Sequence, residues 1–190
     1  MDKFTNLKKI SDKEKKKELS SILFENEYVK VKDYEGWTII EESDCVVCIP
    51  ILMDSNQSIL REEYIPTFKK RTGNEMYITV LSGTIEKGES PEETLKRELK
   101  EEAGIILRDN LNITFENRLF MTKGNMSYYH LCLLPLYLND FTETYASGDG
   151  SKAEKMSRTV KVNNYNLDNL IINDTITELM IMKLKNFIDI

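Results

Sequence analysis

The chain has 190 residues, of which 41% are hydrophobic and 31% are charged, a composition typical of a globular protein that buries its core in one domain. Its net charge of -6 at pH 7 argues against a surface for nucleic acid. No apolar run reaches the roughly 18 residues that a membrane span needs, and none follows the lysine-rich N-terminus as in a signal peptide, so we expect no membrane partner and a cytosolic location.

Residues 1–42 are expected to form an N-terminal arm and a β-hairpin segment. Residues 1 to about 18 are rich in lysine, which predicts a short helix or a frayed arm, with contact to phosphate as the alternative. From residue 19 to about residue 40 the pattern is β-like on both sides of a turn at 33–36. This pattern predicts a hairpin or two antiparallel strands.

Residues 43–190 alternate predicted strands with loops and helices. The run from Cys45 to Leu52 is nearly all apolar and predicts a buried central strand. A basic loop is expected at residues 69–74, and residues 146–155 form a Gly/Ser-rich stretch of the kind that often carries function. Further strands are predicted at residues 59–64, 76–81, 105–107, 112–121, 128–138 and 159–162.

Two helices have clear terminal signals. Ser90 is placed as an N-cap, Glu93 completes a capping box, and Gly104 is placed to end this central helix. A C-terminal helix begins after Asp174 or Thr175, and its apolar stripe is interpreted as core. Strands on both sides of the central helix and a closing C-terminal helix predict an α/β fold with a mixed sheet covered by helices.

The central helix carries an acidic row. Glu98, Glu101 and Glu102 stand at i, i+3 and i+4, so the three carboxylates lie on one face. Such a row is either a solvated acidic face or a set of oxygen ligands for a hard divalent cation such as Mg²⁺.

Histidine and cysteine offer little alternative chemistry. The pair Cys45-x-x-Cys48 lies in an apolar run with no second pair and no histidine nearby, so we expect neither a zinc site nor a redox motif. His130 is the single histidine and is interpreted as a strand residue with a hydrogen-bonded ring. Carboxylates are therefore left to carry the chemistry.

The helix and the loop before it share one further pattern, formed by Gly83, Glu89, Arg97, Glu98, Leu99, Glu101, Glu102, Gly104 and Ile105. These residues match the Nudix box, G-x5-E-x7-R-E-U-x-E-E-x-G-U, in which U is aliphatic. At usages of roughly 7% per residue type, a chance match of the fixed positions is on the order of one in 10⁸ per start position. The chain thus resembles the Nudix hydrolases, and the resemblance implies an α/β/α sandwich with a mixed sheet and a small β-rich N-terminal segment.

The resemblance also implies a reaction. Nudix enzymes hydrolyse a nucleoside diphosphate linked to another group, with a divalent cation that neutralises phosphate charge and activates water. Glu98, Glu101 and Glu102 are implied as ligands of Mg²⁺, or Mn²⁺, or as groups that orient the attacking water. The carbonyl of Ser82 is an implied further ligand, and Arg97 is implied to position one carboxylate by a charge-assisted hydrogen bond.

Residues outside the box point to a substrate class. A β-rich N-terminal segment with Trp37, followed by Arg61-Glu62-Glu63-Tyr64 before the box, resembles the ADP-ribose and ADP-sugar pyrophosphatases, in which this segment helps to build a homodimer and the adenine site. Trp37 either stacks on a base or anchors the hairpin, and Glu154 is either an additional base or an exposed glutamate without a task. The alternatives are a nucleoside triphosphate, an NADH-like dinucleotide or a capped RNA as substrate, or a catalytically silent nucleotide sensor.

Overall fold

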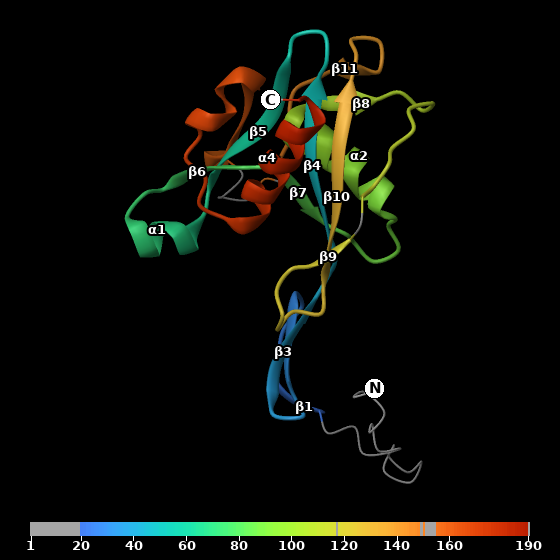
Figure 1. Ribbon diagram of the computed structural model, residues 1–190. Coiled ribbons are helices and arrows are strands. Elements are labelled where there is room, and N and C mark those ends of the chain that lie inside the picture. Colours follow the sequence, from blue (N-terminus) through green and yellow to red (C-terminus); the bar gives the residue numbers. More distant parts are fainter. Residues whose placement is uncertain (1–19, 117, 149, 151–154, 190) are drawn as a thin grey trace, which may run out of the picture. The chain divides into compact units, whose positions relative to one another are not determined.

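The structure is a computed structural model that describes residues 20–116, 118–148, 150 and 155–189 (Figure 1). Both the arm predicted at residues 1 to about 18 and Glu154 lie outside the described residues. The chain divides into two compact units. Unit 1 comprises Met1–Glu42 and Thr122–Met126, and unit 2 comprises Ser43–Met121 and Ser127–Ile190.

Unit 1 contains an antiparallel sheet of three strands, β1 (Ser20–Glu25), β2 (Val29–Tyr34) and β3 (Trp37–Glu42). The sequence predicts a hairpin or two strands here, and the third strand is a correction. Glu35 and Gly36 both have positive φ, the geometry of a two-residue hairpin turn, so β2 and β3 pair directly across it. Residues 122–126 join this unit through backbone hydrogen bonds to Ile40, whose N–H donates to the Gly124 carbonyl over 2.8 Å.

Unit 2 is built on a mixed sheet. Its strands are β4 (Cys45–Leu52), β5 (Gln57–Tyr64), β6 (Met76–Thr79), β7 (Leu81–Thr84), β9 (Leu119–Phe120), β10 (Tyr128–Leu136) and β12 (Arg158–Asn163). The strand order is β12-β5-β4-β10-β9, and β6 pairs with β5 and β7 with β4. Strand β10 runs parallel to β4, and the other pairs are antiparallel. A separate pair joins β8 (Ile105–Leu107) to β11 (Phe141–Glu143).

Helices cover both faces of this sheet. Alternate residues of β4 belong to two separate cores, because successive side chains of a strand point to opposite faces. Cys48 and Leu52 pack with α2 (Pro91–Ala103), whereas Val47, Ile49 and Ile51 pack with α4 (Thr175–Phe187). The predicted α/β/α sandwich with a mixed sheet is therefore confirmed. No helix in the part of the chain that the structure describes is long and apolar enough to span a bilayer.

Two predicted elements are wrong. The strand expected at residues 112–121 is reduced to the two residues of β9, because Ile113 and Phe115 pack against the core beneath α2 without joining the sheet. The basic loop expected at residues 69–74 largely belongs to a short helix, α1 (Pro66–Thr72). Gly73 ends that helix in the left-handed conformation and donates its N–H to the carbonyl of Lys69. A 3₁₀ helix, η1 (Asn164–Asn169), was not predicted.

Candidate active site

The helix α2 begins and ends where its sequence predicts. The Ser90 hydroxyl accepts a hydrogen bond from the N–H of Glu93 over 3.2 Å, and the Glu93 carboxylate accepts one from the N–H of Ser90 over 2.7 Å. This second bond is the main reason that the pKa of Glu93 is lowered. Gly104 ends the helix with φ +64°. The capping-box prediction is confirmed, and these caps fix the two ends of the helix that carries the acidic residues.

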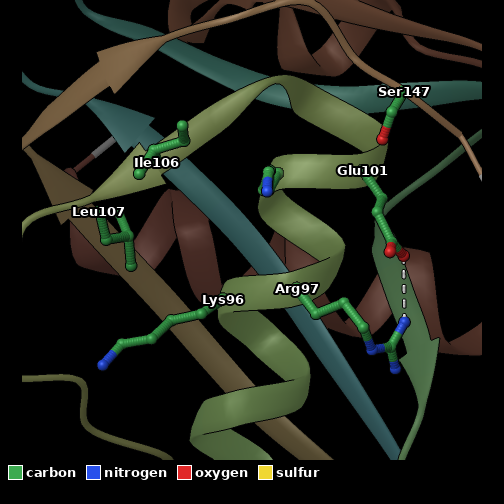
Figure 2. Close-up of a pocket in the computed structure, with 7 residues that line it drawn as sticks. Lys96, Arg97, Glu101, Ile106, Leu107 and Ser147 are labelled. Atoms are coloured by element: carbon green, nitrogen blue, oxygen red, sulfur yellow. Dashed lines mark hydrogen bonds and ion pairs between the residues drawn. The ribbon is translucent and has the colours of Figure 1, made fainter.

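Arg97 gathers three carboxylates around one guanidinium group. Its Nη1 lies 2.7 Å from Oε1 of Glu98 and 3.1 Å from Oε2 of Glu101, the second contact being dashed in Figure 2. Its Nε lies 3.1 Å from Oε1 of Glu89. Glu89 also accepts a hydrogen bond from the hydroxyl of Thr94. These donors, Arg97 first, lower the pKa of Glu89 to about 2, and Glu89 in turn is the main cause of a raised Arg97 pKa.

Glu98 lies against the strand that precedes the helix. A Cβ atom built on Gly83 of β7 would fall 2.0 Å from Oε1 of Glu98, so only glycine leaves room for this carboxylate. Ser82 is the preceding residue of the same strand, paired with Val47 of β4. The box glycine thus brings a helical carboxylate directly onto the backbone of β7.

Glu102 is held from the sheet by a different arginine. Arg61 of β5 places its Nε 3.3 Å from Oε1 of Glu102, and the two side chains are only 4% and 9% exposed. The Thr159 hydroxyl of β12 donates to the backbone carbonyl of Glu102 over 2.5 Å. Both contacts join α2 to strands that are distant in the sequence.

A pocket of about 380 Å³ opens beside Glu101 and Glu102. Arg61, Lys155 and Arg158 are the cationic residues of its wall. Neither Lys155 nor Arg158 was predicted from the sequence as a site residue. Lys155 ends the Gly/Ser-rich stretch and Arg158 follows it closely, and this signal could have found them. The pocket therefore puts positive groups from β5, β12 and the segment before β12 close to two of the acidic residues.

A second pocket, of about 400 Å³, lies on the outer side of α2 (Figure 2). Glu101 and Ser147 line both pockets, so these two residues stand where one pocket meets the other. In the view of Figure 2, Lys96 extends from the other side of the helix than Arg97, on the side where Leu107 of β8 lies. Lys96 forms an ion pair with Glu92 of the same helix over 2.7 Å.

The acidic residues suit a hard divalent cation in their chemistry. Carboxylate and carbonyl oxygens are the ligands that Mg²⁺ and Mn²⁺ prefer, and the space above Gly83 lets Glu98 reach the strand that carries the Ser82 carbonyl. Within the described residues, no three His, Cys, Asp or Glu side chains converge as a ready metal cage.

The remaining candidate residues lie apart from this row. His130 is a strand residue whose Nε2 lies 3.3 Å from Oδ2 of Asp44, so its predicted role as a strand residue with a hydrogen-bonded ring is confirmed. Cys48 is buried beside Cys132 of β10, and burial raises the pKa of its thiol. Trp37 belongs to unit 1, where its side chain is 69% exposed.

Comparisons with known proteins identify a family model that matches the chain and a solved structure of similar fold. A family model described as the NUDIX domain matches residues 43–171. A crystal structure of an ADP compounds hydrolase is similar to the chain with a TM-score of 0.64 and 18% sequence identity, covering 90% of this chain and 91% of that one. At this identity the likeness concerns the fold. Among curated proteins, no sequence matches the chain.

Proposed function

Because this chain is a hydrolase of the NUDIX family, which acts on pyrophosphate bonds, we propose that it cleaves the diphosphate of a nucleoside diphosphate linked to another group, with a divalent cation bound. ADP-ribose or an ADP-sugar is the favoured substrate. The observation that carries the proposal is the acidic face of α2, on which Arg97 joins Glu98 to Glu101 beside a pocket with cationic walls.

The cation would be held by Glu98, Glu101 and Glu102 together with the carbonyl of Ser82. When bound, Mg²⁺ or Mn²⁺ supplies charge neutralisation on the diphosphate and activation of the attacking water. Arg97 keeps the carboxylates oriented through its ion pairs with Glu98 and Glu101 and does not touch the reacting atoms itself.

The diphosphate is proposed to lie in the pocket beside Glu101, within reach of Lys155 and Arg158. The positive charges of these two side chains favour a phosphate-bearing ligand, and an arginine can bind two phosphate oxygens at once. Arg61 lines the same pocket and stays a candidate for substrate contact, as does Trp37 for the base. Glu154, outside the described residues, stays a candidate for the additional base.

The preference for an adenosine diphosphate derivative has two supports. One is the order of Trp37 and Arg61 before the box, and the other is the similar fold of an ADP compounds hydrolase. We also propose that residues 1–42 take part in a homodimer. The three-stranded sheet of unit 1 is too small to bury a core alone, and Leu23 and Phe24 are 57% and 54% exposed. Light scattering of the full chain tests this, because a monomeric mass contradicts it.

A substrate panel tests the proposed reaction. Metal-free protein is supplied with Mg²⁺ and with ADP-ribose, an ADP-sugar, a nucleoside triphosphate, NADH or a capped RNA, and each product is identified by mass. We expect ADP-ribose or the ADP-sugar to be cleaved fastest, to AMP and a phosphorylated remainder. Faster triphosphate or dinucleotide cleavage would contradict the substrate choice, and tight binding without hydrolysis would indicate a silent sensor.

Substitutions on one helix provide the matched control. Glu98→Gln and Glu102→Gln should each lower turnover by about 10²-fold or more, because each removes a charged oxygen ligand from the site. Glu92→Gln changes the same side chain on an exposed position of α2 and should leave turnover unchanged. Unaltered turnover in Glu98→Gln and Glu102→Gln would show that these carboxylates do not carry the reaction.

A further inference from the structure

A row of polar side chains crosses the otherwise apolar face of the sheet beneath α2. Arg61 of β5 pairs with Thr159 of β12 on one side and with Thr79 of β6 on the other. Ile59, two residues earlier on the same face of β5, belongs to the core that packs against Leu95 and Leu99 of α2. The arginine therefore replaces a core residue at the point where the last turn of α2 meets the sheet.

This arginine is as buried as the core around it. Its side chain is 4% exposed, that of Glu102 is 9% exposed, and the Nε and Oε1 atoms lie 3.3 Å apart. Glu102 is also held through its backbone, because the hydroxyl of Thr159 donates a hydrogen bond to the Glu102 carbonyl. Glu102 is thus held at two points, one at each end of the residue.

Burial makes such a pair a poor source of stability. Desolvation of both charges offsets their attraction, and an apolar pair of similar volume often stabilises a fold as well or better. What the pair supplies is a defined position, because removing one partner leaves the other as a buried charge that must move. Here the positioned group is a carboxylate of the acidic row, at the wall of the pocket that Arg61 and Glu101 also line.

We propose that Arg61 is a positioning residue of the cation site, which fixes the carboxylate of Glu102 for ligation. This rests on the cation that the proposed function requires. It differs in kind from a contact with substrate, since Arg61 acts through Glu102. It also differs from the role of Arg97, which holds Glu98 and Glu101 on the helix surface and lies within the box itself.

The direction in which Arg61→Met changes the affinity for the cation distinguishes a positioning role of Arg61 from simple charge repulsion. A positive side chain close to a cation site repels the cation, so on charge alone Arg61→Met would tighten cation binding. If Arg61 holds Glu102 in place, the same substitution weakens binding, because the buried carboxylate leaves the row. A loss of partners around a metal ligand typically lowers metal affinity by about tenfold or more.

The experiment measures Mn²⁺ binding to the metal-free full chain by calorimetry, without nucleotide. Its variants are Arg61→Met, Arg61→Lys, Glu102→Gln and the double substitution of Arg61→Met with Glu102→Gln. Lys161→Met is the matched control, since it removes one positive charge from β12 in an exposed ion pair with Glu143. The thermal unfolding midpoint of each metal-free variant is recorded alongside.

We expect Arg61→Met to weaken Mn²⁺ binding about tenfold and Arg61→Lys to recover part of that loss. The double variant should bind no worse than Glu102→Gln alone, because both changes remove one coupled pair. Lys161→Met should bind as the wild type does. In turnover, excess Mg²⁺ should restore kcat of Arg61→Met with the KM for nucleotide unchanged.

Equal or tighter Mn²⁺ binding by Arg61→Met would overturn the inference while leaving the proposed function intact. A raised KM for nucleotide with unchanged Mn²⁺ affinity would do the same and would assign Arg61 to the substrate. A wild-type chain that binds no Mn²⁺ would overturn the proposed function and this inference together. If Arg61→Met does not fold, unchanged Mn²⁺ affinity in Arg61→Lys, whose ammonium cannot reproduce the geometry of the guanidinium, overturns the inference.

Discussion

The side chain of Glu98 fills the space that a Cβ atom on Gly83 would occupy: such a Cβ would lie 2.0 Å from Oε1 of the carboxylate. Gly83→Ala therefore displaces the end of a flexible side chain, and the fold can absorb that shift. We expect kcat to fall by about 10²-fold while the unfolding midpoint changes little, because a misplaced reacting group costs rate far more than stability. Steady-state kinetics and thermal unfolding check both parts.

The control for this substitution is Gly124→Ala. A Cβ there would lie at an ordinary 3.6 Å from the Thr38 carbonyl, so the added methyl group meets no obstacle. Its kcat should match that of the wild type. A Gly83→Ala protein with full activity would show that the carboxylate of Glu98 does not need its place on β7.

Glu89 should make stability depend on pH in a defined window. Its pKa is lowered from 4.5 to about 2, chiefly by the hydrogen bond from Arg97. A lowered pKa in the folded state stabilises the fold above pH 4.5, and this contribution is lost as the pH falls from 4.5 toward 2. Glu89→Gln should therefore be less stable than the wild type at pH 7 and approach it near the acid end.

Urea unfolding of the metal-free chain at a series of pH values measures that difference. Glu62→Gln is a suitable comparison, because Glu62 pairs with an arginine whose side chain is 72% exposed and such pairs contribute little. A stability difference between Glu89→Gln and the wild type that stays constant down to pH 2 would contradict the assignment of the lowered pKa to Glu89.

Trp37 is the single tryptophan of the chain, so its fluorescence reports on one site. If Trp37 stacks on the base of the substrate, ADP-ribose should quench its emission in a saturable way. Half of the quenching should occur at the ADP-ribose concentration at which half of the protein has bound nucleotide. Trp37→Phe keeps an aromatic ring and serves to show whether KM depends on the indole. Unchanged emission at saturating nucleotide would leave Trp37 as an anchor of its hairpin.

A buried polar cluster outside the site should contribute to stability and not to turnover. The Ser58 hydroxyl and Oδ1 of Asn164 lie 2.7 Å apart, and Nδ2 of Asn164 donates to Oδ1 of Asn56. Because Ser58 and Asn164 are 0% and 1% exposed, Asn164→Ala leaves a buried hydroxyl without this bond and should cost about 1–3 kcal/mol. Asn166→Ala, at an exposed position of η1, should change stability by less than about 0.5 kcal/mol. Urea unfolding compares the two, with kcat expected to be unchanged in both.

Local patterns in the sequence were sufficient to predict a helix or strand wherever the residues that define the element lie within it or next to it. Ser90, Glu93 and Gly104 define the ends of α2 because capping depends on neighbours within a few residues. The apolar run of β4 likewise identified the central strand. The strand predicted over residues 112–121 was wrong, since Ile113 and Phe115 pack against the core without pairing to a strand. The helix α1 was missed because Lys69, Lys70 and Arg71 mark a solvated surface equally well in a loop or a helix.

The sequence by itself determined the acidic row, because the helical period places Glu98, Glu101 and Glu102 on one face whatever surrounds them. Only the tertiary structure decided which groups meet that row. The pairing of Arg61 with Glu102 and the place of Lys155 and Arg158 in the pocket depend on how β5 and β12 pack beneath α2. Contacts of that kind join residues many positions apart, and no local period encodes them.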